Sequence, residues 1–474
     1  MKSNQIHRII QKALDNIFII YPSLHSILDE IAKQKGEAFF VGGMVRDLLL
    51  DRQVKDLDVE VHGLEQDQFV SLLRRFGYVD YVGKSFGVFK LQGVDIDWSL
   101  PRADSVGRKP IVVIDPCMSI QDAFRRRDLT INAMGINIMT GELVDPFGGQ
   151  DDLARGILRS PDITFFAQDP LRFFRVMQFI SRFDMRPDAQ LEAVCKSMDI
   201  KEVSRERIEQ EFAKMLLKSE FPSLGIRWLK SINRISELLP ELAATIGVVQ
   251  DCRWHPEGDV FEHSMQALDA AAALDYEDDK ERLVLLYAAL CHDLGKVTTT
   301  FEDERGIHSY GHAEVGCKIA QKMIKRITHN TLLIEMVRKL VRWHMAPVQL
   351  LKGGAKRAAF KRLAAHLAPE INAIMLAKLV IADHRGRNQI LYKPLIGPIP
   401  EAQQFIDKME QAGVKHAQEQ PLLTGKDFLD VVEPGPLIGR LVKKAYQLQL
   451  EGLYQKDELK RAVLKSIKRS GRSN

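Results

Sequence analysis

The stretch FFVGGMVRDLLLDRQVKDLDVEVHG, residues 39–63, decides the fold of this chain. It begins with an apolar run that ends at Gly42 and Gly43, and a helix is expected over residues 44–50. Strict alternation of polar and apolar residues over 56–61 then predicts a β-strand. The stretch therefore indicates a strand, a tight glycine turn, a helix and a second strand.

Two carboxylates stand out in the second strand. Residues i and i+2 of a strand point to the same face, so Asp56 and Asp58 are expected side by side. A divalent cation relieves their mutual repulsion, and hard oxygen ligands suit Mg²⁺, which also takes phosphate oxygens. The backbone at Gly42 and Gly43 can approach phosphates closely, and Arg46 supplies a cation nearby. The pattern indicates a nucleotide and Mg²⁺ site.

This combination of motifs resembles a known family. Gly42-Gly43-Met44-Val45-Arg46-Asp47, followed by Asp56-Leu57-Asp58, is similar to the signature of class II tRNA nucleotidyltransferases and bacterial poly(A) polymerases, and CCA-adding enzymes match best. The resemblance implies an α+β multidomain chain. Its mixed α/β nucleotidyltransferase head, of the polymerase-beta-like type, would precede an all-α neck and body and an all-α HD domain.

A third carboxylate is expected on a later strand. In Val94-Asp95-Ile96-Asp97-Trp98, acidic and apolar residues alternate. Two-metal phosphoryl transfer benefits from a third carboxylate that binds the cation and activates the attacking hydroxyl. By resemblance this strand carries it. Asp97 is the first choice and Asp95 the second, so the catalytic set is Asp56, Asp58 and Asp97.

A basic motif follows at residues 125–134, Arg-Arg-Arg-Asp-Leu-Thr-Ile-Asn-Ala-Met. It is similar to the family motif that contacts ribose and triphosphate. Arg126 and Arg127 offer bidentate hydrogen bonds to phosphate oxygens. Asp128 and Asn132 lie four residues apart, so on a helix they share a face and would reach the ribose hydroxyls.

The family's base-reading motif falls at the start of a strongly apolar helix. The family carries Glu-Asp-x-x-Arg there, and by position Asp169 and Arg172 inherit the role of hydrogen-bonding the edge of the incoming CTP or ATP, with Arg175 on the same side. Asp169 is also a good N-cap for this helix. Gln168 replaces the family's Glu, which leaves discrimination between CTP and ATP open.

A second constellation lies further along the chain. His263, the pair His292-Asp293, and Asp383 recur on segments expected to be helical, and imidazole with carboxylate favours a transition metal such as Mn²⁺, Ni²⁺ or Co²⁺ over Mg²⁺. The pattern resembles the HD-type metal phosphohydrolase domain. That resemblance implies His263, His292, Asp293 and Asp383 as core ligands, with His312 and His344 as accessory ligands.

The composition of the chain indicates its general class. The chain has 474 residues, 45% of them apolar, a formal net charge of +4 and five scattered cysteines. These values favour several globular domains and a reducing, cytoplasmic location without a membrane span. We expect a head over residues 1–155, a helical neck over 156–245, an HD domain over 250–400, and a helical segment with a basic tail over 401–474.

The resemblance implies template-independent addition of CMP, CMP and AMP to the tRNA 3′ end from CTP and ATP, with release of pyrophosphate. The HD motif adds a phosphatase or 2′,3′-cyclic phosphodiesterase activity. A poly(A) polymerase, or a partial enzyme that adds only CC or only A, is the nearest alternative. A metal phosphohydrolase with an RNA-binding head and a non-enzymatic RNA scaffold are more distant ones. The sequence contains no signal for an oligomeric state.

Overall fold

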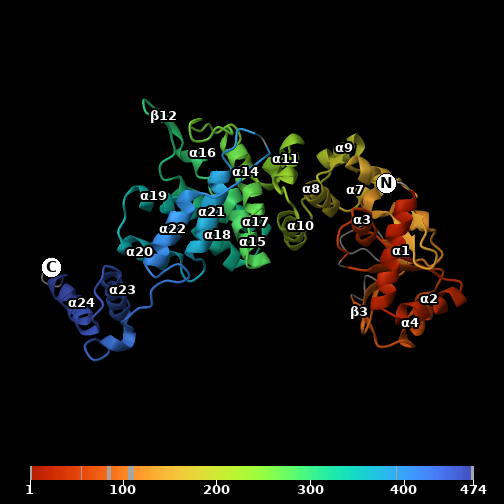
Figure 1. Ribbon diagram of the computed structural model, residues 1–474, viewed down its shortest axis with the longest axis horizontal. Coiled ribbons are helices and arrows are strands. Elements are labelled where there is room, and N and C mark those ends of the chain that lie inside the picture. The colour runs from red at the N-terminus through yellow and green to blue at the C-terminus, as the bar shows by residue number, and fades with distance from the viewer. Residues whose placement is uncertain (1–2, 55, 83–86, 105–111, 391, 471–474) are drawn as a thin grey trace. The chain divides into compact units, whose positions relative to one another are not determined.

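The chain folds into two compact units in the computed structural model shown in Figure 1. The structure describes residues 3–54, 56–82, 87–104, 112–390 and 392–470. The first unit, Met1–Ser204, contains a mixed sheet with helices, and the second, Arg205–Asn474, is almost entirely helical. The expected α+β class is confirmed, whereas the finer boundaries at 155, 245 and 400 stay predictions.

The sheet of the first unit has seven strands in the order β3-β4-β5-β2-β1-β8-β9. The pair β2 and β5 is parallel, and every other neighbouring pair is antiparallel. The parallel pair at the centre places the start of β2 beside the middle of β5. The strands are β1 Glu37–Val41, β2 Asp58–His62, β3 Val79–Val82, β4 Val88–Leu91, β5 Val94–Ser99, β8 Gly135–Asn137 and β9 Leu143–Val144.

Alternation along the strands separates a core face from an open face. Val59, Val61, Ile96 and Trp98 are fully buried in one apolar cluster together with residues of the first four helices. Their neighbours in the strands, such as Asp58, point the other way. One face of the sheet is thus covered by α1 Ser3–Ile20, α2 Ser23–Lys33, α3 Gly43–Leu49 and α4 Gln66–Arg74.

The predicted strand over residues 56–61 begins two residues late. The ladder with β1 and β5 starts at Asp58, so Asp56 lies in the extended segment before β2. The expected helix over 44–50 is α3, which begins at Gly43 because Gly42 turns the chain with φ 71°. Most of the predicted strand–turn–helix–strand order is therefore confirmed.

Short elements connect the sheet to the end of the first unit. The longest, α8, buries Phe173, Phe174, Val176 and Met177 and carries the expected base-reading segment at its start. The elements are β6 Arg102–Asp104, β7 Val112–Ile114, α5 Ile120–Arg125, η1 Thr130–Asn132, α6 Gly149–Arg155, β10 Ile157–Leu158, α7 Ile163–Ala167, α8 Leu171–Phe183, β11 Arg186–Pro187 and α9 Ala189–Ser197.

The second unit is a helical bundle with one small hairpin. Helices α14, α15, α17, α18 and α21 pack against one another at its centre. No helix among the described residues is long and apolar enough to cross a membrane. Up to the hairpin the elements are α10 Arg205–Lys218, α11 Ser223–Ser231, α12 Ile235–Leu238, α13 Pro240–Ala243, α14 Val260–Ala272, α15 Asp279–Cys291, α16 Lys296–Thr299, β12 Phe301–Asp303 and β13 Gly306–His308.

The remainder of the bundle begins directly after the hairpin, where α17 starts at His312. The last helix lies at the expected basic end of the chain, whose residues 471–474 fall outside the described part. The elements are α17 His312–Ile327, α18 Thr331–Trp343, α19 Ala346–Lys352, α20 Arg357–Leu367, α21 Ala373–Arg385, α22 Pro400–Gln411, η2 Gly425–Phe428, α23 Pro436–Leu450 and α24 Lys456–Ser470.

Candidate active sites

Two carboxylates of the first unit meet on the open face of the sheet. Asp58 and Asp97 are direct partners in the parallel pairing of β2 with β5. Burial raises the pKa of Asp58, and the neighbouring charge of Asp97 raises it further. Lys90 lies 2.9 Å from Asp97 and offsets part of this negative charge. Both carboxylates line a cavity of about 500 Å³.

The register favours Asp97 over Asp95 as the third carboxylate. Asp95 shares the face of Asp97, but it lies two residues earlier in β5, is exposed, and does not line the cavity. Asp56 lies just before β2, and its charge also raises the pKa of Asp58. The three acidic positions expected from the sequence thus lie around the start of β2 and the middle of the neighbouring β5.

Basic side chains line the same cavity as the carboxylates. They come from β6, from the loop after α5 and from α8, and they are Arg102, Arg126, Arg127, Arg172 and Arg175. Arg127 donates to Glu60 (3.2 Å), which lies on β2 one step beyond Asp58 on the same face. The sequence analysis missed Glu60, although the period of two that paired Asp56 with Asp58 also includes it. A cavity with carboxylates and guanidinium groups suits a metal–triphosphate complex.

The remaining predicted nucleotide contacts form a buried chain of hydrogen bonds. Arg46 is only 5% exposed and donates to Asn132 Oδ1 (2.5 Å). Asn132 Nδ2 donates to Asp128 Oδ1 (2.9 Å), and Arg175 Nε donates to Asp128 Oδ2 (2.6 Å). Asp128 and Asn132 meet as expected, but not on a regular helix face, because Asn132 ends the short 3₁₀ turn η1. This series of hydrogen bonds connects α3, η1 and α8.

The charge of Asp128 in this hydrogen-bond network is expected to contribute to the free energy of unfolding. Burial would raise the pKa of Asp128, but Arg175 and Asn132 outweigh it and lower the pKa to about 2. A lowered pKa means that the ionised carboxylate stabilises the fold above pH 4 and that this contribution is lost as the pH falls toward 2. We expect Asp128→Asn to cost about 2 kcal/mol at pH 7.

The measurement is thermal unfolding at pH 7 and at pH 3. The difference in melting temperature between Asp128→Asn and the parent chain should be smaller at pH 3, where part of the contribution of the Asp128 charge is lost. Asp15→Asn, on the exposed side of α1, serves as the matched control and should leave the melting temperature unchanged at both pH values. An equal difference at pH 7 and pH 3 would contradict the assigned role of the Asp128 charge.

The predicted base-reading pair lies at the start of α8. Asp169 Oδ1 accepts from the backbone N–H of Leu171 (3.1 Å), so the expected capping contact is present, although α8 itself begins at Leu171. Arg172 donates to the carbonyl oxygens of Phe165 (2.8 Å) and Arg126 (2.6 Å). Gln168 is exposed at the end of α7. Asp169 and Arg172 both line the cavity.

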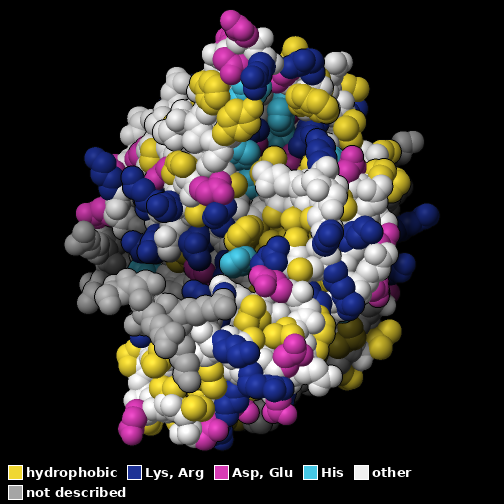
Figure 2. Space-filling model, turned by 90° about the vertical axis from the view of Figure 1, so that its left-hand side faces the viewer, with side chains coloured by type: hydrophobic (Ala, Val, Ile, Leu, Met, Phe, Trp, Pro, Cys, Tyr) yellow, Lys and Arg dark blue, Asp and Glu magenta, His cyan; other side chains and the backbone are white. Residues whose placement is uncertain are grey.

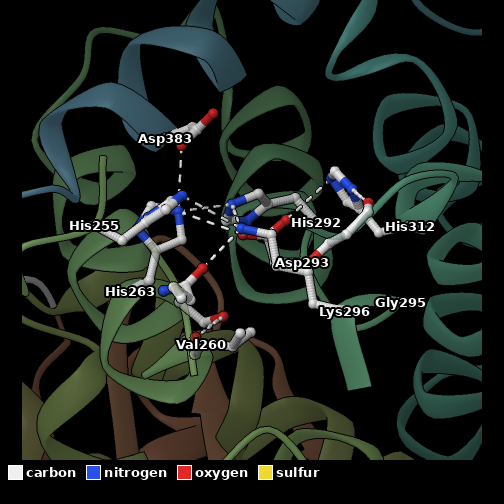
Figure 3. A network of polar contacts seen from close by, with 12 residues as sticks. His255, Val260, His263, His292, Asp293, Gly295, Lys296, His312 and Asp383 are labelled. Carbon is white, nitrogen blue, oxygen red and sulfur yellow. Dashed lines mark hydrogen bonds and ion pairs between the residues drawn. The ribbon is translucent and has the colours of Figure 1, made fainter. Parts of the chain in front are cut away.

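The second unit brings the four expected core ligands together, as Figure 3 shows. His263 Nε2 lies 3.1 Å from His292 Nε2 and 3.2 Å from Asp383 Oδ1. Asp293 Oδ2 lies 3.3 Å from His292 Nε2 and 3.6 Å from His263 Nε2. The four residues come from α14, the end of α15 and α21, and all four are buried.

The two accessory histidines approach the other oxygen of the same aspartate. Asp293 Oδ1 lies 3.4 Å from His312 Nε2 and 3.8 Å from His344 Nε2, and the two ring nitrogens are 3.1 Å apart. Asp293 therefore stands between two groups of donors, each with spacing that suits a metal ion. The sequence pattern placed all six residues in one centre, and the structure brings them together.

Family models match the two parts of the chain that contain these candidate sites. The poly A polymerase head domain matches residues 38–159, and the HD domain matches residues 260–383. A multifunctional CCA protein from Nitrosococcus oceani is 34% identical over 380 residues, which cover 78% of this chain and 88% of the relative. One from Pasteurella multocida is 32% identical and covers 74% and 84%. This chain belongs to the multifunctional CCA protein family.

Solved structures show the same fold over almost the whole chain. A CCA-adding enzyme in its apo form II has a TM-score of 0.60 at 21% identity and covers 97% of this chain and 96% of its own. The Bacillus stearothermophilus CCA-adding enzyme in complex with CTP has a TM-score of 0.62 at 17% identity, covering 96% and 99%. The fold expected for this family is thus confirmed.

The histidines of the centre are oriented by contacts at their other ring nitrogen. Nδ1 of His292, His312 and His344 lies 2.8, 2.7 and 2.7 Å from the backbone oxygens of Ala289, Ser309 and Val341. Burial lowers the pKa of His344 to about 3, so its ring is neutral. The neutral ring of His344 places its Nε2 3.1 Å from His312 Nε2, while Nδ1 of each ring contacts a backbone oxygen. A divalent cation could take both Nε2 atoms as ligands, so the donor set fits a metal.

Further charged residues contact the centre, and two of them, Glu257 and Arg387, were not found from the sequence. Glu257 Oε1 lies 2.7 Å from His263 Nδ1 and 2.9 Å from His255 Nδ1. Arg387 donates to Asp383 Oδ1 (2.7 Å), and Lys296 Nζ lies 2.7 Å from Asp293 Oδ2. Arg387 follows Asp383 by four residues, a spacing that the sequence does offer. Glu257 lies in the turn before α14, where no periodicity points to it.

Proposed function

We propose that the cavity of the first unit adds CMP, CMP and AMP to the 3′ end of tRNA. The observation that carries this proposal is the parallel pair Asp58 and Asp97 in one cavity with five arginines. The family supports it, because the chain is an enzyme related to CCA-adding proteins. The neighbour from Thermotoga maritima was solved in complex with tRNA, which makes tRNA the natural candidate for the acceptor.

Each group of the cavity has a role in this proposal. Asp58, with Asp56 and Asp97, would hold Mg²⁺, which supplies activation of the attacking hydroxyl and neutralises charge on the phosphates. Arg126 and Arg127 bind the triphosphate through charge-assisted hydrogen bonds. The 3′ oxygen of the tRNA forms a bond to the α-phosphorus, the bond from that phosphorus to the β-phosphate oxygen breaks, and pyrophosphate leaves. Asp169 and Arg172 read the base edge before this step.

Incorporation from labelled CTP and ATP, separately and together, tests the proposal on a tRNA transcript that lacks its 3′ CCA. Addition of two C residues and one A, with no further growth, supports it. A long A tail would assign a poly(A) polymerase, and CC alone or A alone would assign a partial enzyme. Absence of incorporation would leave the HD centre as the main activity. Gln168 is exposed and is not among the residues that line the cavity, so the same experiment decides whether its replacement of Glu restricts the enzyme to a partial activity.

A second activity is favoured by the six donors around Asp293. We propose that this centre hydrolyses phosphate esters with a transition metal such as Mn²⁺, Ni²⁺ or Co²⁺, because imidazole nitrogens outnumber carboxylates among the donors. His263, His292, Asp293 and Asp383 would hold one cation, and Asp293 is shared with His312 and His344. Water attacks phosphorus, the ester bond breaks, and the ribose oxygen leaves with a proton. A cytoplasmic location follows from the tRNA substrate.

The contact between Glu257 and His263 is expected to raise the affinity of the HD centre for a metal ion. Residues that orient a metal-binding histidine through its second nitrogen contribute about 10- to 100-fold to affinity. Glu257→Gln removes the carboxylate charge beside His263 Nδ1 and His255 Nδ1. We expect the dissociation constant of the HD centre for Mn²⁺ to rise by about that factor.

Calorimetric titration of the metal-free chain with Mn²⁺ measures this effect without reference to activity. The matched control is Glu220→Gln, an exposed glutamate outside the centre, which should bind Mn²⁺ like the parent chain. An unchanged affinity in Glu257→Gln would show that His263 needs no orienting carboxylate.

A further inference from the structure

An exposed stack of aromatic rings stands on the hairpin of the second unit. The ring of Tyr310 lies parallel to that of His308, with centroids 5.2 Å apart and an angle of 9° between the planes. Phe301, at the start of β12, contacts both rings, at 5.7 Å from His308 and 5.8 Å from Tyr310. Tyr310 is 70% exposed and Phe301 45%. The stack fixes the orientation of Tyr310 and leaves most of its ring open to solvent.

Burial contributes little to the stability of this exposed aromatic stack. An aromatic side chain stabilises a fold mainly when it is removed from water, and Tyr310 is not. Its hydroxyl lies 3.4 Å from His308 Nδ1, within the hairpin itself. A rigid, exposed ring held by other rings is instead the feature by which proteins bind unpaired nucleobases, which stack on aromatic faces regardless of sequence.

The position of Tyr310 connects the stack to the HD centre. Tyr310 precedes the metal-ligand candidate His312 by two residues, so their Cα atoms are at most about 7 Å apart. Both residues line a cavity of about 290 Å³, together with Glu314, Arg342 and Trp343. Figure 2 shows histidine side chains in a hollow of this part of the surface, flanked by hydrophobic and basic side chains. The cavity therefore leads from the donor cluster to the aromatic stack.

The cavity also offers polar groups beside the rings. Arg342 pairs with Glu314 across its wall, and both side chains remain partly exposed, at 33% and 53%. Together they present donors and acceptors of the kind that read a base edge or ribose hydroxyls. A centre that bound simple phosphate esters alone would need neither the rings nor this pair.

We propose that Tyr310 is the base-stacking residue of the HD centre, so that the centre selects esters that carry an unpaired nucleobase. The proposal rests on the phosphohydrolase function proposed above. The phosphate lies at the donors around Asp293, and the base lies on the open face of Tyr310 beside Trp343. The base can belong to a free nucleotide or to the 3′ end of an RNA.

The test compares two monoesters that differ in the base. Hydrolysis of adenosine 2′-monophosphate and of glycerol 2-phosphate is measured with Mn²⁺ in the full chain, in Tyr310→Ala and in Tyr310→Phe. Tyr310→Ala should lower kcat/KM for the nucleotide by about 5- to 150-fold, equivalent to about 1–3 kcal/mol per stacked base. Hydrolysis of glycerol 2-phosphate should stay within twofold, and Tyr310→Phe should retain nucleotide hydrolysis.

Two further arms complete the experiment. Tyr78→Ala is the matched control, since Tyr78 is also 70% exposed but lies in the first unit. An oligoribonucleotide that ends in a 2′-phosphate separates the two sources of the base. A higher kcat/KM for the oligoribonucleotide than for the nucleotide assigns RNA ends, and the reverse assigns free nucleotides. An equal loss on both monoesters in Tyr310→Ala would overturn the proposal, because Tyr310 would then act only through His312.

Photocrosslinking separates a failure of this proposal from a failure of the phosphohydrolase function. Adenosine 2′-monophosphate with an 8-azido group is irradiated with the full chain, and the labelled tryptic peptide is sequenced. Label in residues 306–318, the peptide that contains Tyr310, supports base stacking even if neither ester is hydrolysed. Label confined to the first unit overturns the proposal, even if hydrolysis proceeds.

Discussion

Asp58→Asn is expected to lower the rate of CMP incorporation into tRNA by about 10³-fold. Metal-bound carboxylates contribute several kcal/mol to phosphoryl transfer, and about 4 kcal/mol corresponds to that factor. Asp58 is the carboxylate most central to the cavity, because it pairs with Asp97 across the two strands and because both Asp56 and Asp97 raise its pKa. The amide of Asn keeps the shape of the side chain and removes the charge that a cation needs.

The measurement is single-turnover incorporation from labelled CTP, with thermal unfolding as a check of the fold. Asp95→Asn is the matched control, because Asp95 lies on the same strand and face as Asp97 but outside the cavity. It should incorporate CMP at close to the parent rate. Full incorporation by Asp58→Asn, or an equally severe loss in Asp95→Asn, would show that the cation is held elsewhere.

Asp293→Asn is expected to abolish phosphate-ester hydrolysis, by about 10³-fold or more, and to leave CMP incorporation unchanged. Asp293 contacts both groups of donors, with Oδ2 at 3.3 Å from His292 Nε2 and Oδ1 at 3.4 Å from His312 Nε2. Lys296 and the histidines hold the pKa of Asp293 well below its usual range, although burial opposes them. Its charge is therefore present throughout the physiological range and is removed by the substitution.

Bound metal after dialysis provides a readout that does not depend on activity. Elemental analysis of the chain loaded with Mn²⁺ should show reduced metal content in Asp293→Asn. The exposed Asp275→Asn, just beyond α14, should retain the parent content. Hydrolysis at the parent rate in Asp293→Asn would remove the HD centre as the source of that activity, whereas a parallel loss of CMP incorporation would indicate a general effect on folding.

Local patterns predicted much of the first unit. Alternation along residues 56–61 and 94–98 gave the strands, and the placement of Asp58 on the open face followed from it. The sequence ranked Asp97 above Asp95 only by resemblance, because the register of β2 against β5 depends on the packing of an intervening helix and two strands. A shift of two residues in that register would place Asp95 opposite Asp58 instead of Asp97.

The buried contact between Arg46 and Asn132 could not be predicted from the sequence either. Both were expected at the nucleotide, and their contact joins residues 86 positions apart in the chain. Only the folded sheet brings α3 against η1. In the second unit, the histidines and aspartates were found because their pattern on segments expected to be helical resembles the HD-type domain. Glu257 was not found because it lies in the turn before α14. Its contact with His263 depends on the path that the backbone takes into that helix.

The hydrogen bonds of α8 have a consequence for how nucleotides are exchanged. Arg172 donates to the carbonyl oxygen of Arg126, and Arg175 donates to Asp128, so the helix proposed to read the base is connected to the loop proposed to bind the triphosphate. Under the proposed function, a shift of the reading residues between CTP and ATP would also move the triphosphate-binding loop. A nucleotide that fits neither arrangement would then hold its α-phosphorus out of line with the 3′ oxygen of the tRNA.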